Sequence, residues 1–125
     1  MKNVICSPLA PDALGPYSQA IEANGMVFTS GQIPLDPATG EISGTTIEEQ
    51  TERVMQNLKF VLAQAGVGFD HVVKTTCFLA DLADFTAFNA VYGKYFPENP
   101  PARSCFQVAA LPKNAKLEVE VIAVR

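Results

Sequence analysis

The chain carries an arginine and a glutamate on two β-type segments that follow each other along the sequence. Arg103 lies in residues 102–108 and Glu118 lies in residues 117–121. An arginine guanidinium matches a planar carboxylate with two parallel hydrogen bonds, and a glutamate can orient or deprotonate a water molecule. The pair therefore predicts a site for a small carboxylic acid that reacts with water. The alternative interpretation is a pair of surface charges or a salt bridge, because most charged residues are exposed.

The composition is that of a single globular domain spanning residues 1–125. Of the 125 residues, 48% are hydrophobic and 18% are charged, which allows a real core but leaves no room for a second domain. No apolar run is long enough to span a membrane, and the N-terminal residues lack the apolar stretch of a secretory signal. We therefore expect a cytoplasmic protein with no membrane partner. The net charge of −4 argues against nucleic acid as a partner, because such proteins usually present a basic face.

The reactive side chains disfavour several familiar types of site. Cys6, Cys77 and Cys105 are far apart in sequence and form no metal-binding pattern. In a reducing cytosol they are expected to be free thiols. His71 is the only histidine, so a histidine-assisted nucleophile has a single candidate base. We expect neither a metal nor a cofactor.

The dipeptide Asn24-Gly25 lies between two β-type segments, residues 17–23 and 26–33. Both residue types tolerate positive φ, so this is a strong signal for a β-hairpin with a two-residue loop. A glycine inside a strand also indicates that another segment or a ligand approaches closely. The hairpin register brings together three small or polar positions at one end: Tyr17, Ser30 and Gly31.

Two helices are predicted to cover one face of the sheet. A capping box formed by Thr46 and Glu49 starts the first helix, which ends before Gly66. A β-branched segment then predicts a strand. The second helix starts at Asp81 or Asp84, and its aromatic stripe is expected to pack on the sheet as core.

Side-chain alternation places the charged residues on particular strand faces. Arg103 and Cys105 share one face of their strand, and Glu118 and Glu120 share one face of the next. We expect the more apolar faces, including Phe106, to contact the helices, and the charged faces to lie together on the uncovered side. An uncovered face that mixes apolar and charged residues is typical of a subunit interface. The site is therefore expected in a cleft between subunits.

Blocks spread in order over almost the whole chain carry a resemblance to a known family: Gly15-Pro16-Tyr17-Ser18-Gln19-Ala20, Thr29-Ser30-Gly31-Gln32-Ile33-Pro34, Val73-Lys74-Thr75-Thr76, Asn89-Ala90-Val91-Tyr92, Pro101-Ala102-Arg103-Ser104-Cys105 and Leu117-Glu118-Val119-Glu120. With them the chain resembles the RidA family, also called YjgF/YER057c/UK114. The resemblance implies a chorismate-mutase-like (bacillus type) α+β fold, with a mixed β-sheet and two helices packed on one face. It also implies a homotrimer with sites between subunits.

The implied activity is hydrolysis of reactive 2-imino acids and their enamine tautomers to 2-oxo acids and ammonia, with 2-iminobutanoate, 2-iminopropanoate and 2-aminoacrylate as substrates. The resemblance assigns Arg103 to the substrate carboxylate and Glu118 to the attacking water. Because the uncatalysed reaction is already fast, neither a metal nor a covalent nucleophile is required. The other implied substrate-binding positions are Tyr17, Ser30, Gly31, Asn89 and, through its backbone, Cys105.

Two other functions fit the same sequence. Family members have been linked to RNA cleavage and to inhibition of translation, which the acidic charge and the lack of a basic, aromatic-rich face disfavour here. A protein that binds 2-oxo acids, or acts as a chaperone, without turnover would use the same Arg103 pocket. Loss of turnover with retained ligand binding in a Glu118 variant would favour the enzyme.

Overall fold

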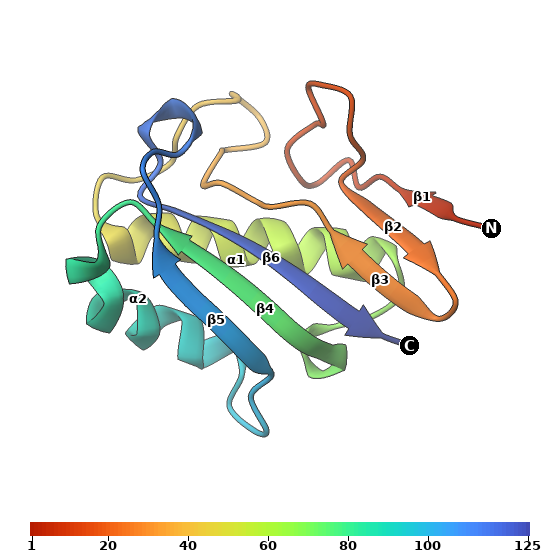
Figure 1. Ribbon diagram of the computed structural model, residues 1–125. Coiled ribbons are helices and arrows are strands. Elements are labelled where there is room, and N and C mark those ends of the chain that lie inside the picture. Colours follow the sequence, from red (N-terminus) through yellow and green to blue (C-terminus); the bar gives the residue numbers. More distant parts are fainter.

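The computed structural model describes all 125 residues, and its six strands form one sheet (Figure 1). The strand order in the sheet is β1-β2-β3-β6-β4-β5. Short 3₁₀ turns lie between several of the elements. In chain order the strands and helices are β1 (Asn3–Ile5), β2 (Ala20–Ala23), β3 (Met26–Thr29), α1 (Ile47–Gln64), β4 (Val72–Leu79), α2 (Phe85–Tyr92), β5 (Ala102–Gln107) and β6 (Leu117–Val124).

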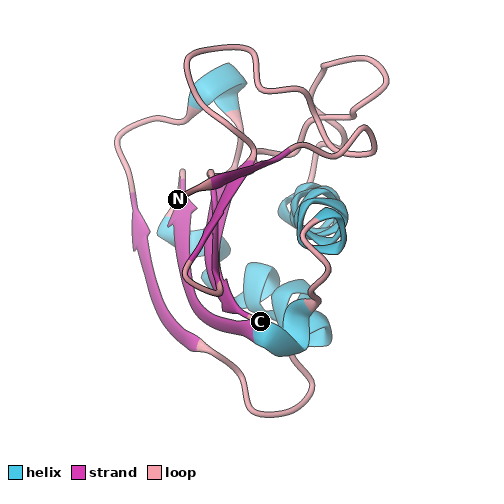
Figure 2. Ribbon diagram, turned by 90° about the vertical axis from the view of Figure 1, so that its right-hand side faces the viewer, coloured by secondary structure: helices cyan, strands magenta, loops and turns pink.

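Both helices lie on the same side of the sheet, and the other side has no helical cover (Figure 2). The hydrophobic core fills the space between these two layers, with Leu58 and Leu62 from α1 facing Val119 and Val121 from β6. β4 and β5 pair in parallel, whereas β6 is antiparallel to both β3 and β4. The predicted α+β class, a mixed sheet with two helices on one face, is confirmed. No helix combines the length and the apolar character needed to cross a bilayer.

The ends of α1 follow the sequence signals. The Thr46 hydroxyl accepts a hydrogen bond from the Glu49 N–H at 3.1 Å, and the Glu49 carboxylate accepts one from the Thr46 N–H at 3.1 Å. Hydrogen bonds to the Glu49 carboxylate from the backbone N–H groups of Thr45 and Thr46 lower the pKa of Glu49. Gly66 follows the helix with a φ of +80°, as a C-terminal glycine should. The carbonyl of Ala65 also accepts a hydrogen bond from the side chain of Arg125, which brings a positive charge to the C-terminal end of the helix.

The hairpin between β2 and β3 forms as predicted but is shorter. Asn24 and Gly25 have φ values of 52° and 74°, and Ala23 pairs with Met26. β3 ends at Thr29, although the Ser30 N–H still donates to the Gln19 carbonyl at 2.9 Å, and Gln32 then exchanges backbone hydrogen bonds with Val119 of β6. Residues 17–19, which were predicted as strand, form a loop before β2.

Candidate active site

The predicted site residues fall into two groups that lie on opposite faces of the sheet. On β5, Arg103 is in register with Thr75 of β4, which is fully buried beneath the helices. On β6, Glu118 is in register with Phe78. Residues in register on neighbouring strands share a face, and Thr75 and Phe78 are an odd number of positions apart. Arg103 therefore faces the helices and Glu118 faces away from them.

The prediction that Arg103 and Glu118 share the uncovered face is wrong. It placed Phe106 against the helices, yet Phe106 is 44% exposed and meets Phe78 edge-on, with ring centroids 5.2 Å apart. Parallel pairing with β4 decides which face of β5 meets the helices, because the buried Cys77 of β4 is in register with Cys105. The last two strands also do not pair, since β4 lies between them.

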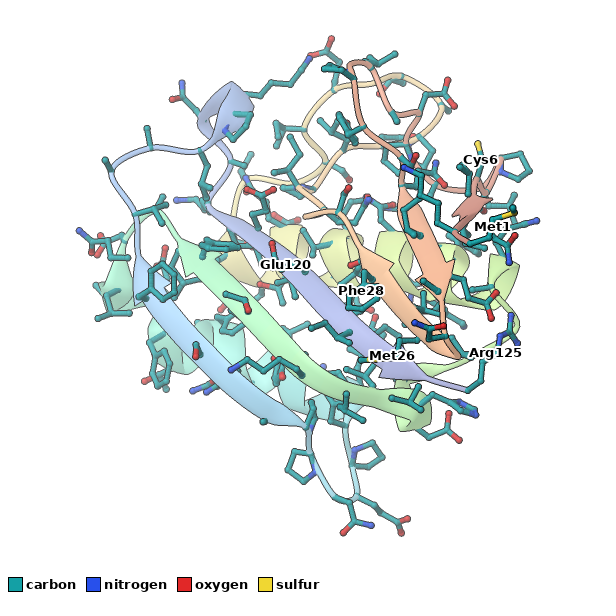
Figure 3. All side chains as sticks on the ribbon, turned by 45° about the vertical axis from the view of Figure 1, so that its right-hand side comes forward. Met1, Cys6, Met26, Phe28, Glu120 and Arg125 are labelled. Carbon is teal, nitrogen blue, oxygen red and sulfur yellow. The ribbon has the colours of Figure 1, made fainter.

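The uncovered face carries apolar side chains together with carboxylates. Phe28 of β3 is 40% exposed there, and Glu120 of β6 is exposed. Figure 3 shows both side chains on the side of the sheet that has no helices. Burial of the carboxyl raises the pKa of Glu118, and the negative charge of Glu120 raises it further. Glu118 therefore keeps its proton to a higher pH than an ordinary glutamate.

Four of the predicted site residues line one cavity of about 340 Å³. Glu118 reaches it from β6, and the other three come from the loops that flank the hairpin. The Ser30 hydroxyl donates a hydrogen bond to the carbonyl of Ser18 at 2.6 Å, which ties the loop before β2 to the end of β3. The cavity is lined by Tyr17, Ser30, Gly31, Ile33, Pro112 and Glu118.

Gly31 lies directly against the side chain of Glu118. A Cβ atom on Gly31 would be 2.7 Å from Cδ and 2.9 Å from Cγ of Glu118, closer than real atoms pack. The close approach expected at this glycine is therefore made by the glutamate itself. Gly31 leaves the space in which the Glu118 carboxyl lies.

The second group surrounds the Arg103 guanidinium on the helix side of the sheet. Arg103 Nη1 donates a hydrogen bond to Asn89 Oδ1 of α2 at 2.7 Å. Its Cζ atom lies 4.9 Å from the ring centroid of Tyr92, 5.4 Å from that of Phe85 and 5.9 Å from that of Phe88. This geometry allows cation–π attraction. The side chain is thus held along one edge and over its planar face.

The aromatic stripe of α2 was predicted only as core. Phe88 and Tyr92 are indeed buried, but the same rings also surround the arginine. Asn89 lies one helical turn after Phe85, so the two side chains share a face of α2. This polar residue beside the aromatic stripe was the available signal that the face contacts a polar group.

Cys105 is half-buried and belongs to the Arg103 group. Burial raises the pKa of its thiol, and the nearby Arg103 charge opposes this only in part. Burial raises the pKa of Cys77 to about 12. His71 contacts Asp70 and Gly68, so it is not paired with a cysteine. All three cysteines are free thiols, as predicted, and no cluster of three or more histidine, cysteine or acidic side chains is arranged to hold a metal ion.

Comparison with known proteins identifies the family. The family model described as endoribonuclease L-PSP matches residues 7–125. Reactive Intermediate Deaminase A, chloroplastic, from Arabidopsis thaliana is 54% identical over 122 residues, which cover 98% of this chain and 65% of the relative. The chain belongs to the RidA family.

Solved structures of RidA-family proteins have the same fold as this chain. The crystal structure of a candidate endoribonuclease L-PSP from Entamoeba histolytica has 58% sequence identity and a TM-score of 0.97, and the match covers 100% of both chains. The structure of E. coli TdcF with bound serine has 44% identity and a TM-score of 0.94, over 98% of both chains. The resemblance seen in the sequence blocks is confirmed. A cytoplasmic location stays a prediction, since the Arabidopsis relative is named as chloroplastic.

Proposed function

We propose that this RidA-family protein hydrolyses 2-imino acids and their enamine tautomers to 2-oxo acids and ammonia. The observation that carries the proposal is the state of Arg103 and Glu118: both are half-buried, and neither forms an ion pair within the chain. A half-buried charge with no opposite charge beside it is a candidate for binding a ligand. The name of the Arabidopsis relative, a reactive intermediate deaminase, supports the same chemistry.

We further propose that the two groups of residues meet between neighbouring copies in a cyclic homotrimer. In one copy Arg103 and Glu118 lie on opposite faces of the sheet, so a single chain cannot bring both to one small substrate. The exposed rings of Phe28 and Phe106 give the uncovered face apolar surface that a second copy can bury. β5 lies at the edge of the sheet, where another chain can approach its backbone.

The reaction follows from these positions. Arg103 of one copy binds the substrate carboxylate, and Glu118 of the next copy orients a water molecule toward the imine carbon. The water oxygen bonds to that carbon as Glu118 accepts one water proton, and the C=N electron pair moves to nitrogen, which takes up a proton from solvent. Glu118 then transfers its proton to the amine, and the C–N bond breaks. Ammonia leaves with the bonding electron pair, and the hydroxyl loses its proton to solvent as its oxygen becomes the carbonyl of the 2-oxo acid.

Mixing two inactive variants tests the proposed site. Arg103→Ala and Glu118→Gln chains are unfolded, mixed in equal amounts and refolded, and imine hydrolysis is measured. If each site takes Arg103 from one copy and Glu118 from another, about one quarter of the sites in random trimers have both residues intact. Activity should therefore return to about a quarter of the wild-type value. No recovery, with trimers seen by light scattering, would refute a site shared between copies.

The pH dependence of the reaction should report the ionisation of Glu118. As a base Glu118 must be ionised, so kcat/KM should fall as the pH drops through its raised pKa. Glu120→Gln removes one of the two causes of that increase. The fall in kcat/KM should therefore move to lower pH in Glu120→Gln, with the plateau unchanged. An unmoved profile would show that Glu120 does not influence the catalytic base.

Gly31→Ala should displace the Glu118 side chain and reduce turnover by at least tenfold, because the new methyl group would occupy the place of the carboxyl. Binding of 2-oxobutanoate should persist, since Arg103 is untouched. Gly93→Ala is a control for the loss of a glycine, because no atom lies within 4 Å of a Cβ at that position and its backbone φ of −61° suits alanine. Normal turnover in Gly31→Ala would mean that Glu118 need not occupy its observed position.

RNA cleavage is the second candidate function, because the matched family model is described as an endoribonuclease. The net charge of −4 disfavours it. A ribonuclease assay on the purified protein separates the two candidates: RNA cleavage that survives in Arg103→Ala and Glu118→Gln would belong to a different site.

A further inference from the structure

We propose that Asn89 is a positioning residue that acts through Arg103 instead of contacting the substrate, and that the Tyr92 ring is the platform on which the guanidinium lies. The inference rests on the proposed function, which gives Arg103 the substrate carboxylate. It changes the role of Asn89 from a substrate-binding residue to one that prepares the arginine.

The contact between Asn89 and Arg103 is short and charge-assisted. The Asn89 amide oxygen accepts from Arg103 Nη1 at 2.7 Å, within the range of strong hydrogen bonds to ionised donors. An amide oxygen carries no net charge, so this contact fixes the guanidinium without neutralising it. A guanidinium has five N–H donors, and the Asn89 oxygen takes up one of them. The remaining donors stay free for a carboxylate.

A second hydrogen bond, which is buried, fixes the Tyr92 ring. The Tyr92 hydroxyl and the Thr75 hydroxyl are 2.8 Å apart, with Tyr92 only 6% exposed and Thr75 fully buried. Thr75 is also the residue in register with Arg103 on the neighbouring strand. Thr75 therefore lies beside Arg103 on the neighbouring strand and also holds the Tyr92 ring that lies beneath the guanidinium.

This arrangement lowers the cost of ligand binding. An arginine side chain has many rotamers, and their loss opposes binding when the side chain is free beforehand. Asn89 and Tyr92 remove this freedom before the ligand arrives. Loss of Asn89 should therefore weaken binding of the carboxylate, so that KM increases more than kcat falls.

The first test does not depend on catalysis. In the unliganded protein, the Arg103 guanidinium N–H signals are measured by NMR, which detects hindered rotation about the bonds to Cζ. We expect hindered rotation in the wild type, averaging in Asn89→Ala and hindered rotation in Asn89→Asp, which keeps the acceptor. Unchanged signals in a folded Asn89→Ala would overturn the positioning role, whatever the protein does to imines.

The second test separates an indirect effect from a direct substrate contact. kcat/KM for imine hydrolysis is measured for Asn89→Ala, for Arg103→Lys and for the double variant. Loss of a charge-assisted hydrogen bond should reduce kcat/KM by about tenfold when Arg103 is present, and by little when residue 103 is already lysine. Equal losses in both backgrounds would show that Asn89 contacts the substrate and would overturn the proposal.

Asn89→Asp tests whether the acceptor must be neutral, because its carboxylate can still hold the guanidinium but neutralises the positive charge. We expect this variant to keep the restrained NMR signals and yet lose affinity for 2-oxobutanoate. Full affinity would contradict the requirement for a neutral acceptor. Absence of turnover in the wild type would refute the proposed function and leave the NMR test of positioning intact.

Discussion

Arg103→Ala is expected to abolish imine hydrolysis, and Arg103→Lys to impair it severely, with assembly unchanged. Alanine removes both the charge and the hydrogen-bond donors, whereas lysine keeps the charge but loses the planar fork that matches a carboxylate. Lysine also cannot reproduce the hydrogen bond that Arg103 Nη1 donates to Asn89. The measurement is a coupled assay in which a threonine or serine dehydratase releases the imine, semicarbazide traps it, and loss of trapped imine is followed with and without the protein.

The chain offers a matched control for this experiment. Arg53 on α1 donates from Nε to the side chain of Asn57 at 3.1 Å, so it makes the same type of contact without being one of the predicted site residues. Arg53→Ala should keep full activity. Near-normal turnover in Arg103→Ala would show that the substrate carboxylate is held elsewhere.

Glu118→Gln should lose most of the activity while still binding a 2-oxo acid. Glutamine keeps the size and hydrogen bonding of the side chain but cannot accept the proton from water, and a well-placed general base contributes roughly a hundredfold or more in rate. Arg103 is unaffected, so calorimetric titration with 2-oxobutanoate should give a similar dissociation constant. Glu120→Gln is the matched control two residues away, and it should remain active near neutral pH.

The outcome also separates an enzyme from a protein that only binds 2-oxo acids. The assignment fails if Glu120→Gln is inactive and Glu118→Gln is not. A catalytic role for either carboxylate fails if neither change slows turnover. Tight binding of 2-oxobutanoate by a wild type that does not turn over the imine would favour the binding protein.

Local signals predicted the elements well because each depends on neighbouring residues. The capping box at Thr46, the glycine at position 66 and the Asn24-Gly25 turn all act over a few positions. The face of β5 could not be predicted in this way. The hydrophobic pattern of β5 alternates weakly, with Arg103 and Cys105 on one side and Phe106 on the other. Which side faces the helices is set by the register with β4, and no local pattern reveals that register.

The same limit applies to the candidate site. Tyr17, Ser30, Gly31, Asn89 and Cys105 were assigned to substrate binding from family resemblance, but the division of the site residues into two groups follows from tertiary structure alone. The role of Gly31 was half-predicted, since its sequence position indicated a close approach but not that Glu118 makes it. The aromatic rings around Arg103 were missed because a helical apolar stripe is usually explained fully by the core.

The position of β6 in the sheet has a consequence for synthesis on the ribosome. β6 is the last of the six strands along the chain, yet it lies between β3 and β4 and pairs with both. Until residues 117–124 have emerged, the hairpin and the β4–β5 pair have no common partner, and each exposes an unpaired strand edge. The sheet therefore stays incomplete until β6 has been made, and the unpaired strand edges of that state favour aggregation.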